Sequence, residues 1–189
     1  MKIGLYFGSF NPIHIGHLII ASHIADFTSV KQVWFVVSPQ NPLKSSASLL
    51  NEHQRLFLVN KAIENDYRFR ACDVEFKMPK PSYTIDTLTY LHEQYPEHEF
   101  LIIIGSDSYQ NIRQWKNYEK LISQYQFIIY ERPGFAIENK LNSSIDVVKA
   151  PMLDISATQI RENIKTGKSI CYLVPAVVID EIEKGKYYK

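Results

Sequence analysis

The first 17 residues constrain the fold more than any other part of the sequence. A short apolar run, Ile3-Gly4-Leu5-Tyr6-Phe7, ends in a Gly-Ser-Phe turn, and a helical pattern follows over residues 15–27. A strand that passes through a glycine turn into a helix places main-chain N–H groups beside the positive end of that helix. The glycine also lets the backbone approach an anion closely. This pattern predicts a phosphate-binding site.

Short β-rich runs alternate with helical patterns along the chain. The runs cover residues 2–7, 32–37, 100–104 and 127–130, and the third has no polar face, as expected for a central strand. The alternation predicts an α/β fold with a doubly wound, mainly parallel sheet. In such sheets ligands bind outside the carboxyl ends of the strands, so residues that follow a strand should converge on one crevice. These residues are Gly8, Pro39, Gly105 and Arg132.

The length of 189 residues and the composition suit one compact domain. Hydrophobic residues make up 46% and charged residues 22%, which is typical of a soluble globular protein. We expect residues 1–189 to form a single domain with a small C-terminal helical portion from about 155 to 189. Further helices are expected over 51–65, where Asn51 and Gln54 have capping-box spacing, and over about 175–184. Loops are expected at 38–50 and 133–145.

The charge balance and the cysteines bear on partners and compartment. Lysine and arginine number 21 against 20 acidic residues, so the net charge of +1 does not favour nucleic acid as a partner. No apolar run approaches the roughly 20 residues that span a bilayer. The two cysteines, Cys72 and Cys171, lack metal-ligand spacing and do not form a disulfide framework. We expect a cytoplasmic protein without membrane contact, and a homo-oligomer stays open.

The glycine turn leads into His14-Ile15-Gly16-His17. The two histidines are three residues apart at a helix start, so their rings should lie on one side of the helix, where both can donate to phosphate oxygens. The N–H groups of Gly8, Ser9 and Phe10 can face the same anion. The alternative is that the histidines only cap or pack. Zinc is disfavoured, because no third ligand appears at recognisable spacing.

A second helix start lies near the C-terminus, at Ile155-Ser156. Ser156 and Gln159 have capping-box spacing, and Arg161 follows further along the helix. Unpaired N–H groups, a hydroxyl and a guanidinium can there face the β- and γ-phosphates of a nucleotide. A plain capped helix with a solvated arginine explains this segment equally well. The functional interpretation therefore depends on the first motif.

Taken together, the Gly-x-Phe-x-Pro turn, HIGH and I-S-A-T-x-x-R resemble the HxGH nucleotidyltransferase family. Residues 81–88, PSYTIDTL, are similar to the S-Y-T-x-D-T-L segment of its bacterial nicotinate-nucleotide adenylyltransferases. The other elements in the expected order are Lys44, Gly105-x-Asp107, Trp115 and Arg132-Pro133-Gly134, so the resemblance covers nearly the whole chain. Two segments depart from the pattern. Asn-Pro-Leu-Lys replaces Pro-Pro-His-Lys, and Ser-Phe-Asn-Pro-Ile replaces Thr-Phe-Asp-Pro-Pro.

The resemblance implies a Rossmann-like nucleotidyltransferase that transfers AMP from ATP to nicotinate mononucleotide, giving deamido-NAD and pyrophosphate in NAD biosynthesis. Magnesium is expected to be held mainly by the ATP phosphates, with no metal site made by the protein alone. The implied catalytic residues are His14, His17, Lys44 and Arg161. The implied ATP-binding residues are Gly8, Ser9, Phe10, His14, His17, Lys44, Gly105, Asp107, Ile155, Ser156 and Arg161. The implied nicotinate-nucleotide residues are Tyr83, Thr84 and Trp115, with Asp86, Thr87 and Arg132 as further candidates.

Physical reasoning supports nicotinate separately. Tyr83 and Thr84 open a helix whose unpaired N–H groups can receive a carboxylate, which nicotinamide lacks. Trp115 can stack on a pyridinium ring or belong to the core. Asp107 can accept from ribose hydroxyls or cap a helix. The nucleophile is already an anion, so the histidines are expected to act electrostatically and not as bases.

Three alternatives remain. A related HxGH transferase could use nicotinamide mononucleotide or phosphopantetheine, because the phosphate motifs are shared. A nucleotide-binding module could carry the same motifs and be catalytically silent. Class I aminoacyl-tRNA synthetases share HIGH, but 189 residues are few for tRNA-binding and editing modules.

Overall fold

The computed structural model describes residues 1–40, 49–139 and 141–189, and its centre is a six-stranded sheet. Every pair of neighbouring strands in the sheet is parallel, and the strand order is β3-β2-β1-β4-β5-β6. The predicted doubly wound α/β fold is confirmed. The strands are β1 (Lys2–Gly8), β2 (Gln32–Val37), β3 (Phe69–Cys72), β4 (Glu99–Gly105), β5 (Phe127–Tyr130) and β6 (Ile145–Val148).

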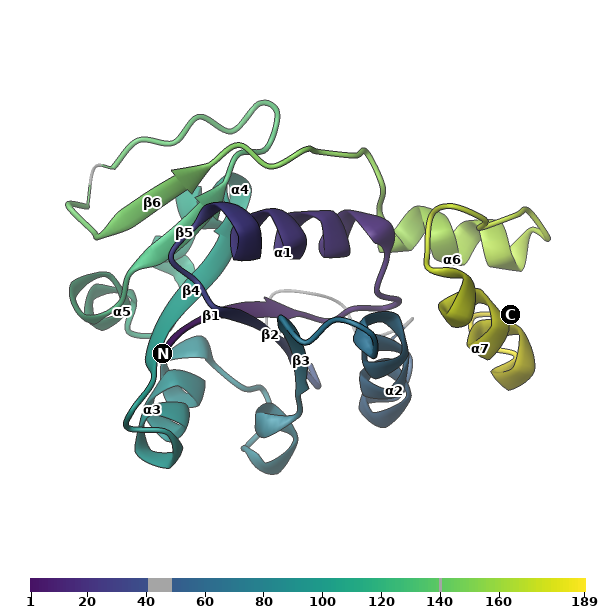
Figure 1. The fold of residues 1–189 in the computed structure, drawn as a ribbon, viewed down its shortest axis with the longest axis horizontal. Coiled ribbons are helices and arrows are strands. Elements are labelled where there is room, and N and C mark those ends of the chain that lie inside the picture. The colour runs from purple at the N-terminus through teal and green to yellow at the C-terminus, as the bar shows by residue number, and fades with distance from the viewer. Residues whose placement is uncertain (41–48, 140) are drawn as a thin grey trace.

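Helices cover both faces of the sheet (Figure 1). One hydrophobic core lies under α1, α2, α6 and α7, and the other lies under α3, α4 and α5. The helices are α1 (Ile15–Phe27), α2 (Glu52–Ile63), α3 (Thr84–Gln94), α4 (Ser106–Gln110), α5 (Tyr118–Gln124), α6 (Ala157–Lys165) and α7 (Ala176–Gly185), with 3-10 turns η1 (Val74–Lys77) and η2 (Ile112–Gln114).

The predicted helices occur close to their expected bounds, with one local correction. Helix α1 covers residues 15–27 as predicted, and α7 matches the helix expected near the C-terminus. Helix α2 begins one residue later than predicted and ends at Ile63. Its cap residue Asn51 accepts from the N–H of His53 at 2.9 Å, so the predicted pairing with Gln54 is wrong.

The two edge strands, β3 and β6, were not predicted. Each has only four residues, and neither shows a continuous apolar run, because an edge strand is covered less completely than a central one. In β3 the side chain of Arg70 lies 4.3 Å from the ring centroid of Trp34 on the neighbouring strand. This stacking accommodates a charged residue within β3, and the sequence FRAC therefore shows no apolar pattern typical of a strand.

The order of the strands places a topological switch point between β1 and β4. The chain leaves β1 for β2 on one side, while β4 pairs with β1 on the other, with Tyr6 opposite Ile103. Both strands therefore end at the same edge of the sheet, with Gly8 closing β1 and Gly105 closing β4. Ligands of such sheets bind outside this edge.

Candidate active site

The turn after β1 is shaped by two residues. Phe10 has a φ of 45°, a left-handed conformation that is uncommon for residues other than glycine. Its buried ring packs edge-on against Tyr6 and Phe35, which anchors the strained residue in the core. A Cβ atom on Gly8 would lie 2.8 Å from this ring, so only glycine fits there. Phe10 can therefore contact a nucleotide only through its main chain.

Arg55, in the first turns of α2, fixes this turn from inside, and the sequence analysis missed it. Its fully buried guanidinium donates to the carbonyls of Ser9, Ser38 and Pro39, and its Nε donates to the carbonyl of Leu50. The C=O and N–H groups of a trans peptide point in opposite directions. Because Arg55 holds the Ser9 carbonyl, the N–H of the next residue faces the other side of the turn.

His14 and His17 form a stacked pair at the start of α1. Their ring centroids are 3.7 Å apart, and the N–H of the cap residue His14 donates to His17 Nδ1 at 3.3 Å. The capping role considered as an alternative is therefore present. It has a chemical consequence, because an Nδ1 that accepts a hydrogen bond carries no proton, which leaves the proton of neutral His17 on Nε2.

His14 is almost fully buried, with 7% of its surface exposed. Burial, followed by the charge of Arg132, lowers the pKa of His14 from 6.5 to about 4. The imidazole is therefore neutral at pH 7 and can donate one hydrogen bond. A Cβ atom on Gly16 would lie 3.1 Å from His14 Nδ1, so the glycine between the histidines lets this ring lie against the helix.

The lowered pKa predicts an acid-sensitive fold. Between pH 6.5 and about 4, His14 is protonated in the unfolded chain but stays neutral in the folded one. The free energy of unfolding therefore decreases as the pH falls through this window. The full effect below the window is about 3 kcal/mol. Urea unfolding of His14→Asn at pH 7 and pH 4.5 should therefore show a smaller loss of stability than the wild type. The exposed His92→Asn serves as the control, and an equal loss in all three proteins would contradict the prediction.

Helix α6 brings the second phosphate motif to the first. Arg161 Nη1 donates to the carbonyl of Asn11 at 2.8 Å, and Nη2 donates to Thr158 Oγ1 at 3.2 Å. Arg161 is therefore half-buried and bound to the first turn, which a plain capped helix with a solvated arginine does not require. Ser156 caps the helix by accepting from the N–H of Gln159 at 3.1 Å, but the Gln159 side chain binds Asn163, so the reciprocal half of the predicted capping box is absent. Ile155 packs against the first core.

The carboxyl ends of β4 and β5 lie on the same edge of the sheet as the turn after β1. Arg132 Nε lies 3.3 Å from Asp107 Oδ1, and the main-chain N–H of Arg132 donates to the buried Ser106 hydroxyl at 2.9 Å. A Cβ atom on Gly105 would overlap the Asp107 carboxylate. The cap of α4 is Gly105, so the alternative role of Asp107 as the cap of this helix is wrong. A hollow of about 620 Å³ opens here, lined by Arg132 to Ala136 and by residues near Lys149.

The start of α3 is joined to the turn that carries Trp115. The cap residue Tyr83 makes no side-chain hydrogen bond to the helix, so its side chain does not cap the first N–H groups. Asp86 accepts from Lys116 Nζ at 2.7 Å, and the same ammonium lies 4.7 Å from the centroid of the Tyr83 ring. Trp115 is partly buried and packs against the second core, so it can serve both packing and stacking.

Thr87 and Lys44 differ from the other predicted site residues. Thr87 is fully buried and donates to Glu75, so the prediction that it contacts a ligand is corrected: it supports the start of α3 from inside. Lys44 lies outside the described residues. Sequence analysis also missed Lys116, which contacts Asp86 and Tyr83 at the start of α3. Its position next to the predicted site residue Trp115 could have indicated it.

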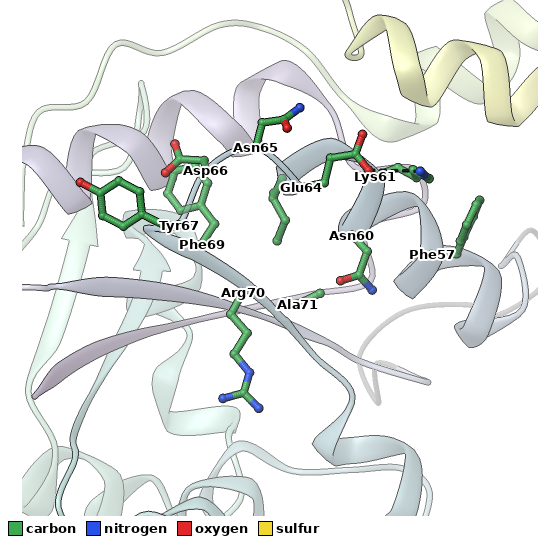
Figure 2. Close-up of a pocket in the computed structure, with 11 residues that line it drawn as sticks. Phe57, Asn60, Lys61, Glu64, Asn65, Asp66, Tyr67, Phe69, Arg70 and Ala71 are labelled. Atoms are coloured by element: carbon green, nitrogen blue, oxygen red, sulfur yellow. Dashed lines mark hydrogen bonds and ion pairs between the residues drawn. The ribbon is translucent and has the colours of Figure 1, made fainter.

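A second hollow, of about 810 Å³, lies away from these residues (Figure 2). It is lined by the later turns of α2 and by the chain that enters β3, from Phe57 to Ala71. The side chains around it carry both signs of charge, including Lys61, Glu64 and Arg70. No residue predicted for the nucleotide site lines this hollow, so the proposed site is the open crevice at the ends of β1 and β4.

Comparison with known proteins identifies the family. Residues 5–163 match the cytidylyltransferase-like family. A protein of Cytophaga hutchinsonii named "probable nicotinate-nucleotide adenylyltransferase" is 50% identical, and the match covers 100% of this chain and 98% of the relative. A protein of the same name from Flavobacterium psychrophilum is 47% identical over the full length of both chains. This chain belongs to the nicotinate-nucleotide adenylyltransferase family.

Solved structures of adenylyltransferases agree with this membership. The nicotinic acid mononucleotide adenylyltransferase of Plasmodium falciparum, complexed with NaAD, superposes with a TM-score of 0.84 at 26% identity. The match covers 99% of this chain and 97% of that one. The resemblance drawn from the sequence motifs is confirmed. Cys72 and Cys171 are both free, and none of the helices in the described ranges is long and apolar enough to cross a membrane.

Proposed function

We propose that this chain is an enzyme that transfers the adenylyl group of ATP to nicotinate mononucleotide, releasing pyrophosphate. The observation that carries the proposal is the contact between Arg161 and Asn11, which are 150 positions apart in the sequence. This contact joins the two phosphate motifs at the switch point of the sheet. The start of α3, which the Tyr83 side chain does not cap, is proposed as a second anion site on the face of the sheet that carries the second core.

The ATP half-site is proposed to hold the triphosphate by main-chain donors and neutral or cationic side chains. The N–H groups of the turn at Gly8, Ser9 and Phe10, the two histidines and Arg161 provide these donors, together with Ile155 and Ser156 at the start of α6. Lys44 is proposed from the sequence alone. Gly105, Asp107 and Arg132 are proposed for the adenosine side, where Asp107 can accept from a ribose hydroxyl.

The reaction needs alignment and charge stabilisation more than proton transfer. An oxygen of the nicotinate mononucleotide phosphate attacks the α-phosphorus of ATP, and the bond from that phosphorus to the bridging oxygen breaks. The leaving pyrophosphate takes the bonding electrons and gains charge, which His17 and Arg161 are placed to stabilise. A neutral His14 fits this role, because it donates a hydrogen bond without acting as an acid.

Magnesium is proposed to arrive with ATP. Within the described ranges, no group of three or more His, Cys, Asp or Glu side chains is placed to hold a metal ion. This ion is commonly held by substrate phosphates and water with few protein ligands. We therefore treat the metal complex of ATP as the substrate. A cytoplasmic location and the single-domain organisation stay predictions, and a homo-oligomer stays open.

The start of α3 is proposed to receive the nicotinate carboxylate. The N–H groups of Thr84 and Ile85 precede the first helical hydrogen bonds, which begin with the N–H of Asp86. A carboxylate is stabilised there by both the donors and the helix dipole. Trp115 is held close by the Asp86–Lys116 ion pair and is proposed to stack on the pyridinium ring.

Pyrophosphate release tests the proposal directly. With ATP and Mg²⁺ present, nicotinate mononucleotide should give much faster release than nicotinamide mononucleotide, because only the acid carries the charge that α3 receives. Phosphopantetheine should give none. Faster turnover of the amide or of phosphopantetheine would overturn the substrate assignment. Absence of turnover with all three compounds would favour a catalytically silent nucleotide-binding module.

A further inference from the structure

Glu75 is a buried carboxylate that the proposed reaction does not use. It lies in η1, directly after β3, and only 2% of its surface is exposed. Within residues 1–40, 49–139 and 141–189, no lysine or arginine forms an ion pair with it. Its partners are hydroxyl groups: Ser82 donates to Oε2 at 2.6 Å and Thr87 donates to Oε1 at 2.9 Å.

A carboxyl in this position is costly for the fold. Burial raises the pKa of Glu75, and the hydroxyl donors oppose that rise only in part. An apolar side chain of similar size avoids this desolvation cost, so the carboxylate is not explained by stability alone. Buried polar groups of this kind can instead fix a particular geometry.

The geometry that Glu75 fixes is the start of α3. Ser82 lies just before the cap residue Tyr83, and Thr87 lies one turn inside the helix. The Thr87 hydroxyl is also 3.2 Å from the carbonyl of Tyr83. One carboxylate therefore holds both ends of the first helical turn. That turn carries the N–H groups of Thr84 and Ile85, which point out of the helix towards the proposed nicotinate carboxylate.

Glu75 is also linked to the phosphate turn through Ser38, at the end of β2. Interaction with the Ser38 side chain lowers the pKa of Glu75 and so opposes the effect of burial, while the Ser38 carbonyl accepts from Arg55 at 2.8 Å. The Ser38 N–H donates to the carbonyl of Gly8 at 2.9 Å. A single residue thus connects the carboxylate to the turn that is proposed to bind ATP.

We propose that Glu75 is a positioning residue that sets the start of α3 against the phosphate turn and thereby determines the affinity for the nicotinate carboxylate. This inference rests on the proposed function. Glu75 is too deeply buried to touch the substrate itself. Its effect is transmitted through Ser82 and Thr87, which makes the mononucleotide site more dependent on it than the ATP site.

Steady-state kinetics of Glu75→Gln tests the inference. Glutamine keeps the size of the side chain, but its NH₂ group cannot accept the second hydroxyl proton. We expect the KM for nicotinate mononucleotide to rise about tenfold, which corresponds to about 1.4 kcal/mol, while the KM for ATP changes less than about twofold. The matched control is Glu93→Gln, an exposed glutamate near the end of α3, which should leave both constants unchanged.

Ser82→Ala supplies a second test that does not depend on the folding of the first variant. It removes one hydroxyl donor to Glu75 and should also raise the KM for nicotinate mononucleotide. The double variant with Glu75→Gln and Ser82→Ala should show less than the sum of the two effects, because both changes disrupt one contact. Equal KM values for wild type and both variants, or equal increases for both substrates, would overturn the inference. A wild-type protein without turnover would instead overturn the proposed function, so the two failures are distinguishable.

Discussion

Replacing His17 with alanine is expected to lower kcat by about 10²–10³-fold, the usual cost of removing a positioned donor to a developing charge. The donor is defined by the fold. Because His17 Nδ1 accepts the N–H of His14 at 3.3 Å, the neutral ring carries its proton on Nε2, which can donate to a phosphate oxygen. Single-turnover formation of deamido-NAD separates this loss from slow product release.

The change should leave the fold in place. Alanine loses the hydrogen bond at the helix start, which costs about 1 kcal/mol, and thermal unfolding measures that loss. His23→Ala, on the same helix but stacked on Phe27 at a distance from the turn, is the matched control and should keep wild-type kcat. A His17→Ala variant with unchanged kcat would show that the histidine caps the helix and has no role at the phosphates.

The sequence predicted the β1–turn–α1 unit well, because three local signals in it agree. An apolar run, a glycine turn and a helical pattern occupy consecutive residues, and each one is determined by short-range chemistry. The contact between α6 and the first turn is different, since nothing local joins Arg161 to Asn11. That pairing followed from the resemblance to a known family and not from the spacing of residues.

Buried polar residues were the main failure of sequence analysis. Arg55 has Val59 four residues later, so it lies on the apolar stripe of α2, and a charged residue in such a stripe was the available signal. Glu75 follows a short edge strand and gives no comparable pattern. Thr87 was assigned to the ligand because its motif does not distinguish groups that face the crevice from groups that face the core. Only tertiary packing makes that distinction.

Replacing Arg55 with methionine is expected to destabilise the protein by about 3–5 kcal/mol, as is typical when a buried polar network loses one partner. Methionine fills part of the space but leaves four carbonyls, of which that of Pro39 is in a buried bond and the other three in partly buried ones, without their donor. The free energy of unfolding in urea measures the loss. The control is Arg113→Met, an exposed arginine in η2, which should change stability by less than about 0.5 kcal/mol.

The catalytic effect of Arg55→Met should have the opposite selectivity to that of Glu75→Gln. Arg55 holds the Ser9 carbonyl and so directs the N–H of Phe10, whereas Glu75 holds the start of α3. At a temperature where the methionine variant is folded, its KM for ATP should therefore rise more than its KM for nicotinate mononucleotide. The stability of Arg55→Lys and its KM for ATP should lie between those of the wild type and Arg55→Met, because one ammonium has three donors and cannot reach four carbonyls. Wild-type stability and an unchanged KM for ATP in Arg55→Met would show that the phosphate turn holds its shape without this arginine.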